Sequence, residues 1–408
     1  MVSCVNHDDK LQSHSLSSVI DKMWEVTFAL SFFYIFFFQN VIFDIGGLII
    51  VLTGVLTIFS LLNWVKTNKG MLSVTPMLWL GVFVTVSLCG SYVFSNNFQD
   101  SLDVGLRMME YLLLAYSLFC FVKSHPYRFY AIIRYIWLSI SLLCIGVLIK
   151  GTAVTSAGGL GLGTLNVNLL SSYILIQVFC SFVLLGNAKK KMNIMLICTS
   201  VVVSLFVQIM AASRRGFLVA SAYLLLAIFF VMIPKYTKRH SKKRILIYMV
   251  LLIALLITIA LLGDYIINET VLGSRFLGNF NSGDIARTRY RNIAIQEFCR
   301  RPILGVGLNG LTSVMGAYSH SLYYETLACT GVVGALILFL MLANVSADLF
   351  KQVKRKEYGA SSNTYVSRLC FLYLVLLFVS GIAVTMIYDF YFFMSVGLVS
   401  AVCSICRD

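Results

Sequence analysis

Hydrophobic runs long enough to cross a membrane follow one another along most of the chain, and short polar stretches separate them. The runs fall at residues 24–43, 46–65, 74–95, 104–122, 129–149, 167–186, 192–212, 216–234, 245–263, 322–347, 368–387 and 390–405. A helix of about 20 apolar residues spans the hydrocarbon core of a bilayer. The pattern therefore predicts an all-α, polytopic membrane helix bundle with about twelve spans, or about eleven if the short last run does not cross. Residues 1–408 are expected to form a single membrane domain.

The composition agrees with a membrane protein. Hydrophobic residues make up 59% of the chain and charged residues only 12%, too few to cover a soluble protein of 408 residues. The formal net charge of +15 is expected to report membrane topology, so no nucleic-acid partner is predicted. The cysteines are scattered, mostly inside the apolar runs, and are expected to act as small buried hydrophobic residues.

Basic residues are distributed unevenly between the runs, and this predicts the orientation of the chain. Lysine and arginine concentrate in the cytoplasmic loops of membrane proteins. If the N-terminus is cytoplasmic, every inward gap is basic and the short outward gaps are not. The inward gaps carry Lys66, Lys69, Lys123, Arg128, Lys189–Lys191, Lys235–Arg244 and Lys351–Lys356. We therefore expect both termini in the cytoplasm and one large extracytoplasmic loop at residues 264–321.

The predicted outer side carries arginine rather than lysine, with Lys150 as the exception. Its arginines are Arg107, Arg214, Arg215, Arg275, Arg287, Arg289, Arg291, Arg300 and Arg301. Positive charge is disfavoured in outer loops, and the planar fork of arginine matches two oxygens of a phosphate group. In a helix, Arg287 and Arg291 lie one turn apart on one face. The pattern predicts a site for an anionic head-group; a loop that only faces solvent or lipid head-groups is the alternative.

Three short segments on this side carry the other candidate residues. Arg214 and Arg215 lie between two spans with almost no loop, where adjacent arginines are costly unless they are paired or face a wet cavity. A Gly-rich turn at residues 302–310 follows the arginine-rich loop. His320 then opens the next span, and it is the only histidine that the predicted topology places outside.

In order and spacing, these segments resemble the O-antigen ligase and polymerase superfamily of bacterial membrane glycosyltransferases. The matching pieces are Ser-Arg-x-Gly at 213–216, Arg287 before Pro-x-x-Gly-x-Gly at 302–307, and His320 with Gly331 eleven residues later. Two positions depart from the family pattern. Ser321 stands where asparagine is usual, and Tyr290–Arg291 replaces the usual tryptophan, which leaves open whether Arg287 or Arg291 is the equivalent arginine. The match covers roughly residues 200–345.

The resemblance implies a glycosyltransferase C-like fold in the bacterial cytoplasmic (inner) membrane, with the active site facing the periplasm or the cell exterior. It implies a substrate in which a glycan is linked by diphosphate to undecaprenol. It also implies that no cofactor, no nucleotide sugar and no essential metal are used. A flippase and a chain-length regulator are the protein partners expected beside the lipid bilayer.

Glycosyl transfer from a lipid diphosphate gives the candidate residues their roles. The leaving diphosphate gains negative charge in the transition state, and aimed arginines stabilise it. We assign this role to Arg214 and Arg287. Three further arginines are expected to help bind substrate: Arg215, Arg289 and Arg291. His320 is the expected base for the acceptor hydroxyl, Glu325 is expected to orient it or to bind the acceptor sugar, and Tyr324 to bind a sugar ring.

Three activities fit this pattern. A polymerase adds the growing glycan to the next lipid-linked repeat unit, as in O-antigen or capsule synthesis. A ligase passes the glycan to another acceptor such as a lipid A core. In the 302–307 turn and the spacing to His320, the chain more closely resembles the polymerase branch of the family. A polysaccharide flippase or transporter is the third candidate, although it would more typically show charges within spans and paired halves.

Overall fold

The structure is a computed structural model that describes residues 7–42, 45, 47–67, 76–95, 97–153, 160–162, 165–232, 270–277, 281–354 and 362–405. These residues are almost entirely helical. The helices are α1 (His7–Phe33), η1 (Tyr34–Phe38), α2 (Gln39–Val41), α3 (Leu48–Thr67), α4 (Pro76–Phe94), α5 (Phe98–Ser124), η2 (Pro126–Arg128), α6 (Phe129–Lys150), α7 (Val167–Leu185), α8 (Lys191–Met210), α9 (Arg214–Ala227), η3 (Ile228–Met232), α12 (Val271–Leu277), α13 (Asn281–Arg300), α14 (Gly310–Met315), α15 (Leu322–Lys354), α16 (Ser362–Ser380), η4 (Gly381–Ala383) and α17 (Phe390–Ile405). A short antiparallel hairpin pairs β1 (Thr152–Ala153) with β2 (Leu160–Gly161).

The helices follow the apolar runs of the sequence. Nine helices in the described part of the chain are long and apolar enough to cross a membrane, and α17 is a shorter apolar helix. This confirms a polytopic, helical membrane protein. The run at 245–263 lies outside the described residues, so the expected number of about twelve spans stays a prediction.

The centre of the bundle is formed by α7 and α17. In α7, 89% of the apolar window is buried, and α17 is buried along Phe390–Cys403. A helix that is apolar on all sides is typical of such a central position. Gly397 lets α17 approach α5 closely, because a Cβ at this position would lie 2.7 Å from the carbonyl oxygen of Ala115.

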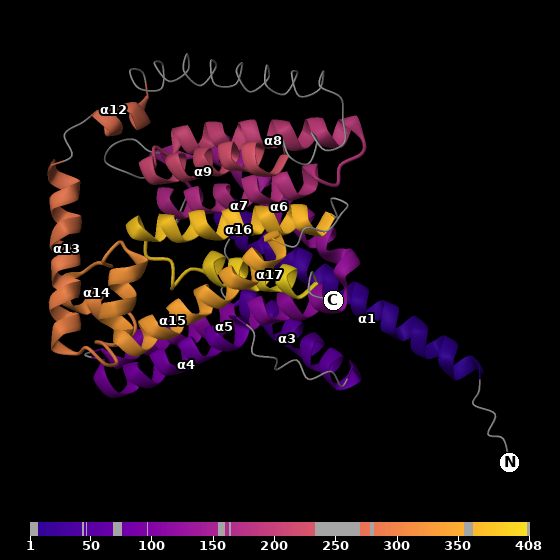
Figure 1. Cartoon of the computed structure of the whole chain (residues 1–408), viewed down its shortest axis with the longest axis horizontal. Helices are drawn as coiled ribbons and strands as arrows, with labels where there is room; N and C mark the ends of the chain where they lie inside the picture. Colours follow the sequence, from indigo (N-terminus) through magenta and orange to yellow (C-terminus); the bar gives the residue numbers. More distant parts are fainter. Residues whose placement is uncertain are drawn as a thin grey trace.

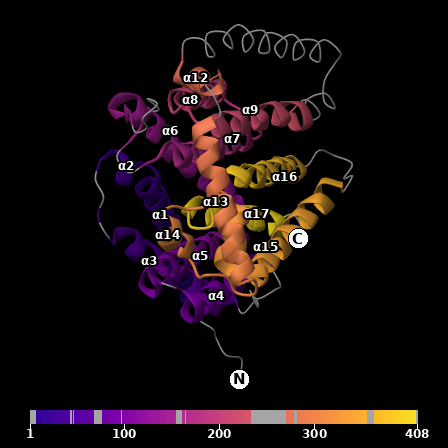
Figure 2. The ribbon, with the colours of Figure 1, turned by 90° about the vertical axis from the view of Figure 1, so that its left-hand side faces the viewer.

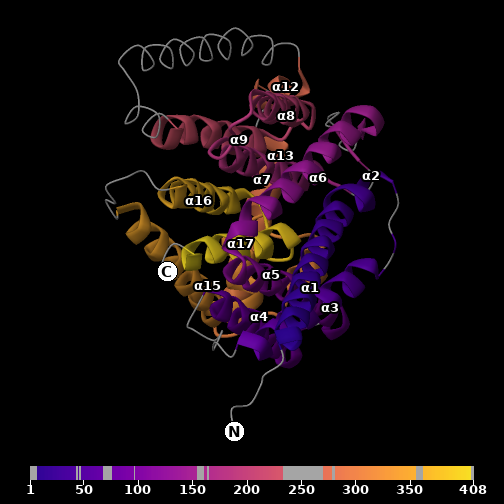
Figure 3. The same cartoon turned by 90° about the vertical axis from the view of Figure 1, so that its right-hand side faces the viewer.

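One helix runs across an end of the bundle instead of along it. In Figure 1, α13 lies at the left, roughly perpendicular to α7, α8 and α16, with α14 beside it. Figure 2 looks at this end directly and shows α13 passing in front of the other helices. We call this side of the molecule the α13 end. Figure 3 shows the opposite end, where α1 begins and α17 finishes.

Hydrogen bonds identify the helix termini that meet at the opposite end. They join Asn63 Nδ2 to Ser124 Oγ at 2.8 Å, Tyr365 OH to the Phe182 carbonyl at 2.7 Å, and Gln352 Nε2 to the Cys403 carbonyl at 2.8 Å. Lysines gather at these termini: Lys123, Lys189–Lys191, Lys351 and Lys354. They belong to the gaps that the sequence analysis assigns to the cytoplasm.

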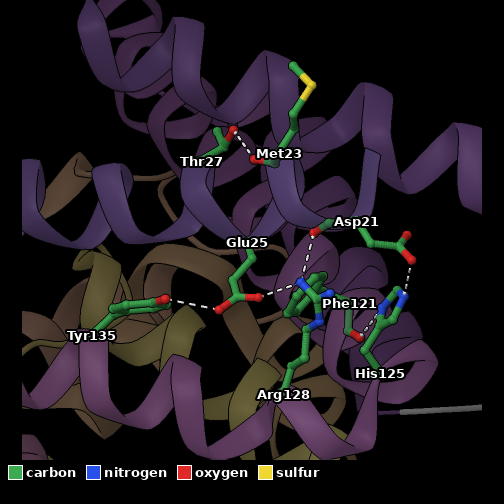
Figure 4. A network of polar contacts seen from close by, with 8 residues as sticks. All are labelled: Asp21, Met23, Glu25, Thr27, Phe121, His125, Arg128 and Tyr135. Carbon is green, nitrogen blue, oxygen red and sulfur yellow. Dashed lines mark hydrogen bonds and ion pairs between the residues drawn. The ribbon is translucent and has the colours of Figure 1, made fainter. Parts of the chain in front are cut away.

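A polar network ties α1 to the junction of α5 and α6 at the opposite end (Figure 4). Arg128 forms an ion pair with Glu25, and the Tyr135 hydroxyl donates to the same carboxylate at 2.9 Å. His125 Nε2 lies 3.2 Å from the carboxylate of Asp21. Charged side chains that would be costly alone near the bilayer are therefore paired with one another.

Candidate active site

The Ser-Arg-x-Gly element begins α9 at the α13 end. Ser213 caps the helix, its Oγ accepting a hydrogen bond at 3.4 Å from the Gly216 N–H. A Cβ on Gly216 would lie 2.3 Å from Cβ of Ser171, so glycine lets α9 pack against α7. Arg215 points inward and its Nη2 donates to the Asn168 carbonyl at 2.9 Å. Its Nε is buried and, within the described part of the chain, has no acceptor.

Asp389 is an acidic neighbour of Arg215 that was not predicted from the sequence. It lies between η4 and α17. Burial raises the pKa of its carboxyl to about 7, while the positive charge of Arg215 acts in the opposite direction. The feature that could have identified it is its position as a lone acid between the apolar runs 368–387 and 390–405, since isolated acids at such depth usually have a partner or a function.

The arginines of the outer loop lie on two faces of α13. Arg287, Tyr290 and Arg291 are half-buried against the bundle, whereas Arg289 is exposed on the other face. Arg291 donates from Nη2 to the Ile382 carbonyl at 3.5 Å. Because i and i+4 share a helix face, Arg287 and Arg291 are directed to the same side, and Arg289 is not.

Tyr324 lies beneath one of these arginines. The guanidinium carbon of Arg291 is 5.8 Å from the centroid of the Tyr324 ring, a cation–π distance. Two other loop arginines fix the end of α13 instead of joining the group. Arg300 pairs with Glu297 at 2.6 Å, and Arg301 donates to the carbonyl of Phe94 on α4.

His320 lies in the short connection between α14 and α15, with a left-handed φ of 55°. Non-glycine residues rarely adopt such a backbone conformation, and the examples that exist cluster at functional sites. The imidazole is half-buried, 5.8 Å from the Tyr290 ring. Burial lowers the pKa of the imidazole below its ordinary value of 6.5, and the nearby charge of Arg287 lowers it further. His320 is therefore neutral at neutral pH, the state that a general base requires.

Glu325 lies fully buried one turn into α15. Its Oε2 accepts a hydrogen bond at 2.8 Å from the backbone N–H of Ser319, the residue before His320. Its Oε1 accepts from the Tyr388 hydroxyl at 3.4 Å. These contacts favour the orienting role predicted for Glu325 over direct binding of a sugar.

The Gly-rich turn is bound into a break in α15. At Gly331, φ is 64° and ψ is −168°, so the helix is interrupted there. The carbonyls of Ala328 and Cys329, just before the break, accept hydrogen bonds from Val306 at 2.9 Å and from Gly307 at 3.1 Å. Just beyond it, the Val332 N–H donates to Pro302 at 2.8 Å. The turn thus satisfies the backbone groups that the break exposes, which gives the spacing of these glycines a physical reason.

These elements bring together residues far apart in sequence. The positive charges of Arg215 and Arg287 are near enough to act on each other, and the charge of Arg287 acts on His320. Arg214, half-buried beside Arg215, begins α9 at the same end. We call Arg214, Arg215, Arg287, Arg291 and His320 the site cluster. A cation-rich cluster with a neutral imidazole, at one end of a helical membrane bundle, fits an enzyme that acts on an anionic lipid-borne substrate.

Comparison with known families agrees with this assignment over part of the chain. A model of the O-antigen ligase family matches residues 199–339, a range that contains the whole site cluster. This match to part of the chain supports the resemblance to the O-antigen ligase and polymerase superfamily seen in its motifs. The family indicates a glycosyltransferase-like membrane enzyme of polysaccharide biosynthesis. No curated protein matches the chain.

Proposed function

We propose that this protein polymerises lipid-linked oligosaccharide repeat units into O-antigen or capsular polysaccharide. The donor would be a glycan on undecaprenyl diphosphate, and the acceptor the next lipid-linked unit. The observation that carries the proposal is the convergence of Arg215, Arg287 and a neutral His320 from three separate elements at one end of the bundle. The reaction would take place at the outer face of the bacterial inner membrane.

The arginines supply the stabilisation that the leaving group needs. As the bond between the anomeric carbon and the diphosphate oxygen breaks, its electron pair passes to the diphosphate. A site with partly desolvated guanidinium groups stabilises that charge more in the transition state than in the ground state. The buried Nε of Arg215, which has no acceptor among the described residues, is a donor available to it. Arg287 and Arg291 face the same side from α13.

His320 supplies the base. A sugar hydroxyl is a weak nucleophile, and removal of its proton as the new glycosidic bond forms lowers the barrier. The imidazole takes that proton and later loses it to the departing diphosphate or to solvent, so the site is regenerated. The same Arg287 charge that helps stabilise the leaving group also keeps His320 unprotonated before reaction.

The orientation of the bundle supports this proposal. Lysines gather at the opposite end, and the α13 end carries the arginines. Because lysine-rich ends face the cytoplasm in most membrane proteins, the site cluster would face outward. A flippase that delivers lipid-linked units to that face, and a chain-length regulator, would be its protein partners.

The test is elongation of lipid-linked repeat units by purified protein in detergent or proteoliposomes, resolved by glycan length. A ladder of products that His320→Ala abolishes supports the polymerase. Products that form only when a lipid A core is added would identify a ligase instead. Movement of the glycan lipid across the bilayer without lengthening would identify a transporter and overturn the enzyme assignment.

A further inference from the structure

Tyr388 lies where the Gly-rich turn, the start of α15 and the segment before α17 meet, and it belongs to none of the family-like sequence motifs. It precedes Asp389 in the segment between η4 and α17, and its ring lies 5.5 Å from that of Tyr318. A phenol hydroxyl can donate one hydrogen bond and accept others. Here it does both, and each partner belongs to a different segment.

As an acceptor, the hydroxyl holds the end of the Gly-rich turn. The backbone N–H of Asn309 donates to Tyr388 OH at 3.1 Å. Asn309 has a left-handed φ of 58° and is the N-cap of α14. Residues 306 and 307 of the same turn are hydrogen-bonded to the break in α15. The Tyr388 hydroxyl therefore fixes the turn at a second point, Asn309.

As a donor, the hydroxyl reaches the loop of the base. Tyr388 OH donates to Glu325 Oε1 at 3.4 Å, and Glu325 Oε2 accepts from the Ser319 N–H at 2.8 Å. Ser319 is fully buried and its Oγ donates to the Ser321 carbonyl at 3.0 Å. The backbone on both sides of His320 is therefore fixed by a chain of bonds that starts at Tyr388.

The third connection is covalent. Asp389 follows Tyr388, and a turn closed by the Asp389 N–H and the Met386 carbonyl at 3.1 Å holds both residues before α17 begins. Asp389 is the acid that lies near enough to Arg215 for the two groups to influence each other. A fixed Tyr388 thus also fixes the backbone that carries Asp389.

We propose that Tyr388 is a positioning residue that holds the His320 loop in a fixed place relative to the Gly-rich turn and to the segment that carries Asp389. This inference rests on the proposed function. In it, Tyr388 helps to set the distance between the base, His320, and the arginines that bind the leaving group. Transfer needs the acceptor oxygen and the anomeric carbon aligned, and a misplacement of about 1 Å can cost about a hundredfold in rate. The hydroxyl acts on alignment and not on binding, because its hydrogen bonds go to Asn309 and Glu325, neither of which belongs to the site cluster.

The experiment compares Tyr388→Phe with Tyr365→Phe in the glycan-elongation assay with the full-length protein. Each variant keeps the ring and removes one hydroxyl that bonds a distant segment, Tyr365 doing so at the opposite end. We expect kcat of Tyr388→Phe to fall about tenfold or more, with KM for the lipid-linked unit within about twofold. Tyr365→Phe should keep kcat.

A second variant, Glu325→Gln, tests the same chain of bonds from its other side. As a single variant, Glu325→Gln should lower kcat. In the double variant with Tyr388→Phe, the fold-loss of kcat should be smaller than the product of the two single losses, because both substitutions interrupt one network. If the Tyr388→Phe protein does not accumulate in the membrane, the effect of Glu325→Gln on kcat still tests the network.

Equal kcat in Tyr388→Phe and Tyr365→Phe, or multiplicative losses in the double variant, would overturn the positioning role while elongation by the wild-type protein still upholds the enzyme. Absence of elongation by the wild-type protein would instead remove the proposed function itself. A rise in KM with unchanged kcat would show that Tyr388 contributes to binding, and would also overturn the inference.

Discussion

The carbonyl oxygen of Ile303 occupies the space where Gly331 would carry a side chain: a Cβ on Gly331 would lie only 2.2 Å from it. The conflict cannot be relieved by a rotamer change, because the neighbouring atoms belong to backbone on both sides. Gly331 also has a φ of 64°, where L-residues are strained. One position therefore joins the helix break to the Gly-rich turn.

Gly331→Ala should destabilise the protein. Alanine at a positive φ costs more than about 1 kcal/mol, and the clash with Ile303 adds to that. The matched control is Gly54→Ala in α3, where an added Cβ would meet nothing within 4 Å and helix propensity improves. Thermal unfolding in detergent should separate the two; equal melting temperatures would show that the turn is not bound to the helix as described.

Arg287→Ala and Arg289→Ala should behave differently although they lie two residues apart. Arg287 is half-buried toward the site cluster and Arg289 is exposed on the opposite face. Loss of one donor to a developing anion typically lowers kcat by about 10²- to 10³-fold, so that loss is expected for Arg287→Ala. Arg289→Ala should stay within about threefold of the wild-type rate. Similar losses in both variants would contradict the face assignment.

The rate of elongation should depend on the protonation of His320. Because burial and then Arg287 lower the pKa of the imidazole below 6.5, the neutral base should persist below that pH. The midpoint of the acidic limb of the rate should therefore lie below pH 6.5, with the full rate reached at higher pH. The measurement is the initial rate between about pH 5 and pH 8.5.

Arg287→Ala tests the direction in which the charge of Arg287 shifts the pKa of His320. Removing a nearby positive charge favours the imidazolium, so the pKa of His320 should rise and the acidic limb of the residual activity should move to higher pH. His320→Gln should lose about 10²- to 10⁴-fold and show no such limb. An acidic limb that does not move in Arg287→Ala would place the titrating group elsewhere.

The two ends of the bundle should differ in access to a membrane-impermeant thiol reagent. Ser313 is exposed on α14 at the α13 end, and Tyr127 is exposed at the opposite end. In intact cells, with Cys299 replaced by serine, Ser313→Cys should be labelled from outside, and Tyr127→Cys only after permeabilisation. The reversed pattern would contradict both the inward-lysine orientation and an outward-facing site.

Much of the fold was predictable because its main determinant is local. Runs of apolar residues long enough to span a bilayer become helices, and nine of the described helices coincide with such runs. The shared face of Arg287 and Arg291 followed from helical spacing alone. The spacing of His320 and Gly331 was recognised as a motif, but its reason, a turn bonded into a helix break, needed coordinates.

The parts that escaped prediction depend on contacts between distant segments. The Asn309–Tyr388 bond joins residues 79 positions apart, and periodicity carries no information on such a pair. Asp389 lies outside the residues that resemble the family, and only its proximity to Arg215 reveals it. Arg289 could not be separated from its neighbours until the inward face of α13 was known.

The pairing of the 302–307 turn with the break in α15 has a consequence for chain entropy. Residues 308–327, with His320 among them, form a closed loop whose two ends are joined through backbone hydrogen bonds. The entropy of closing this loop is lost when the protein folds, as it would be for a loop closed by a disulfide. The loop that carries His320 is thus ordered before any substrate binds, and under the proposed function binding energy from the substrate need not be used to order it.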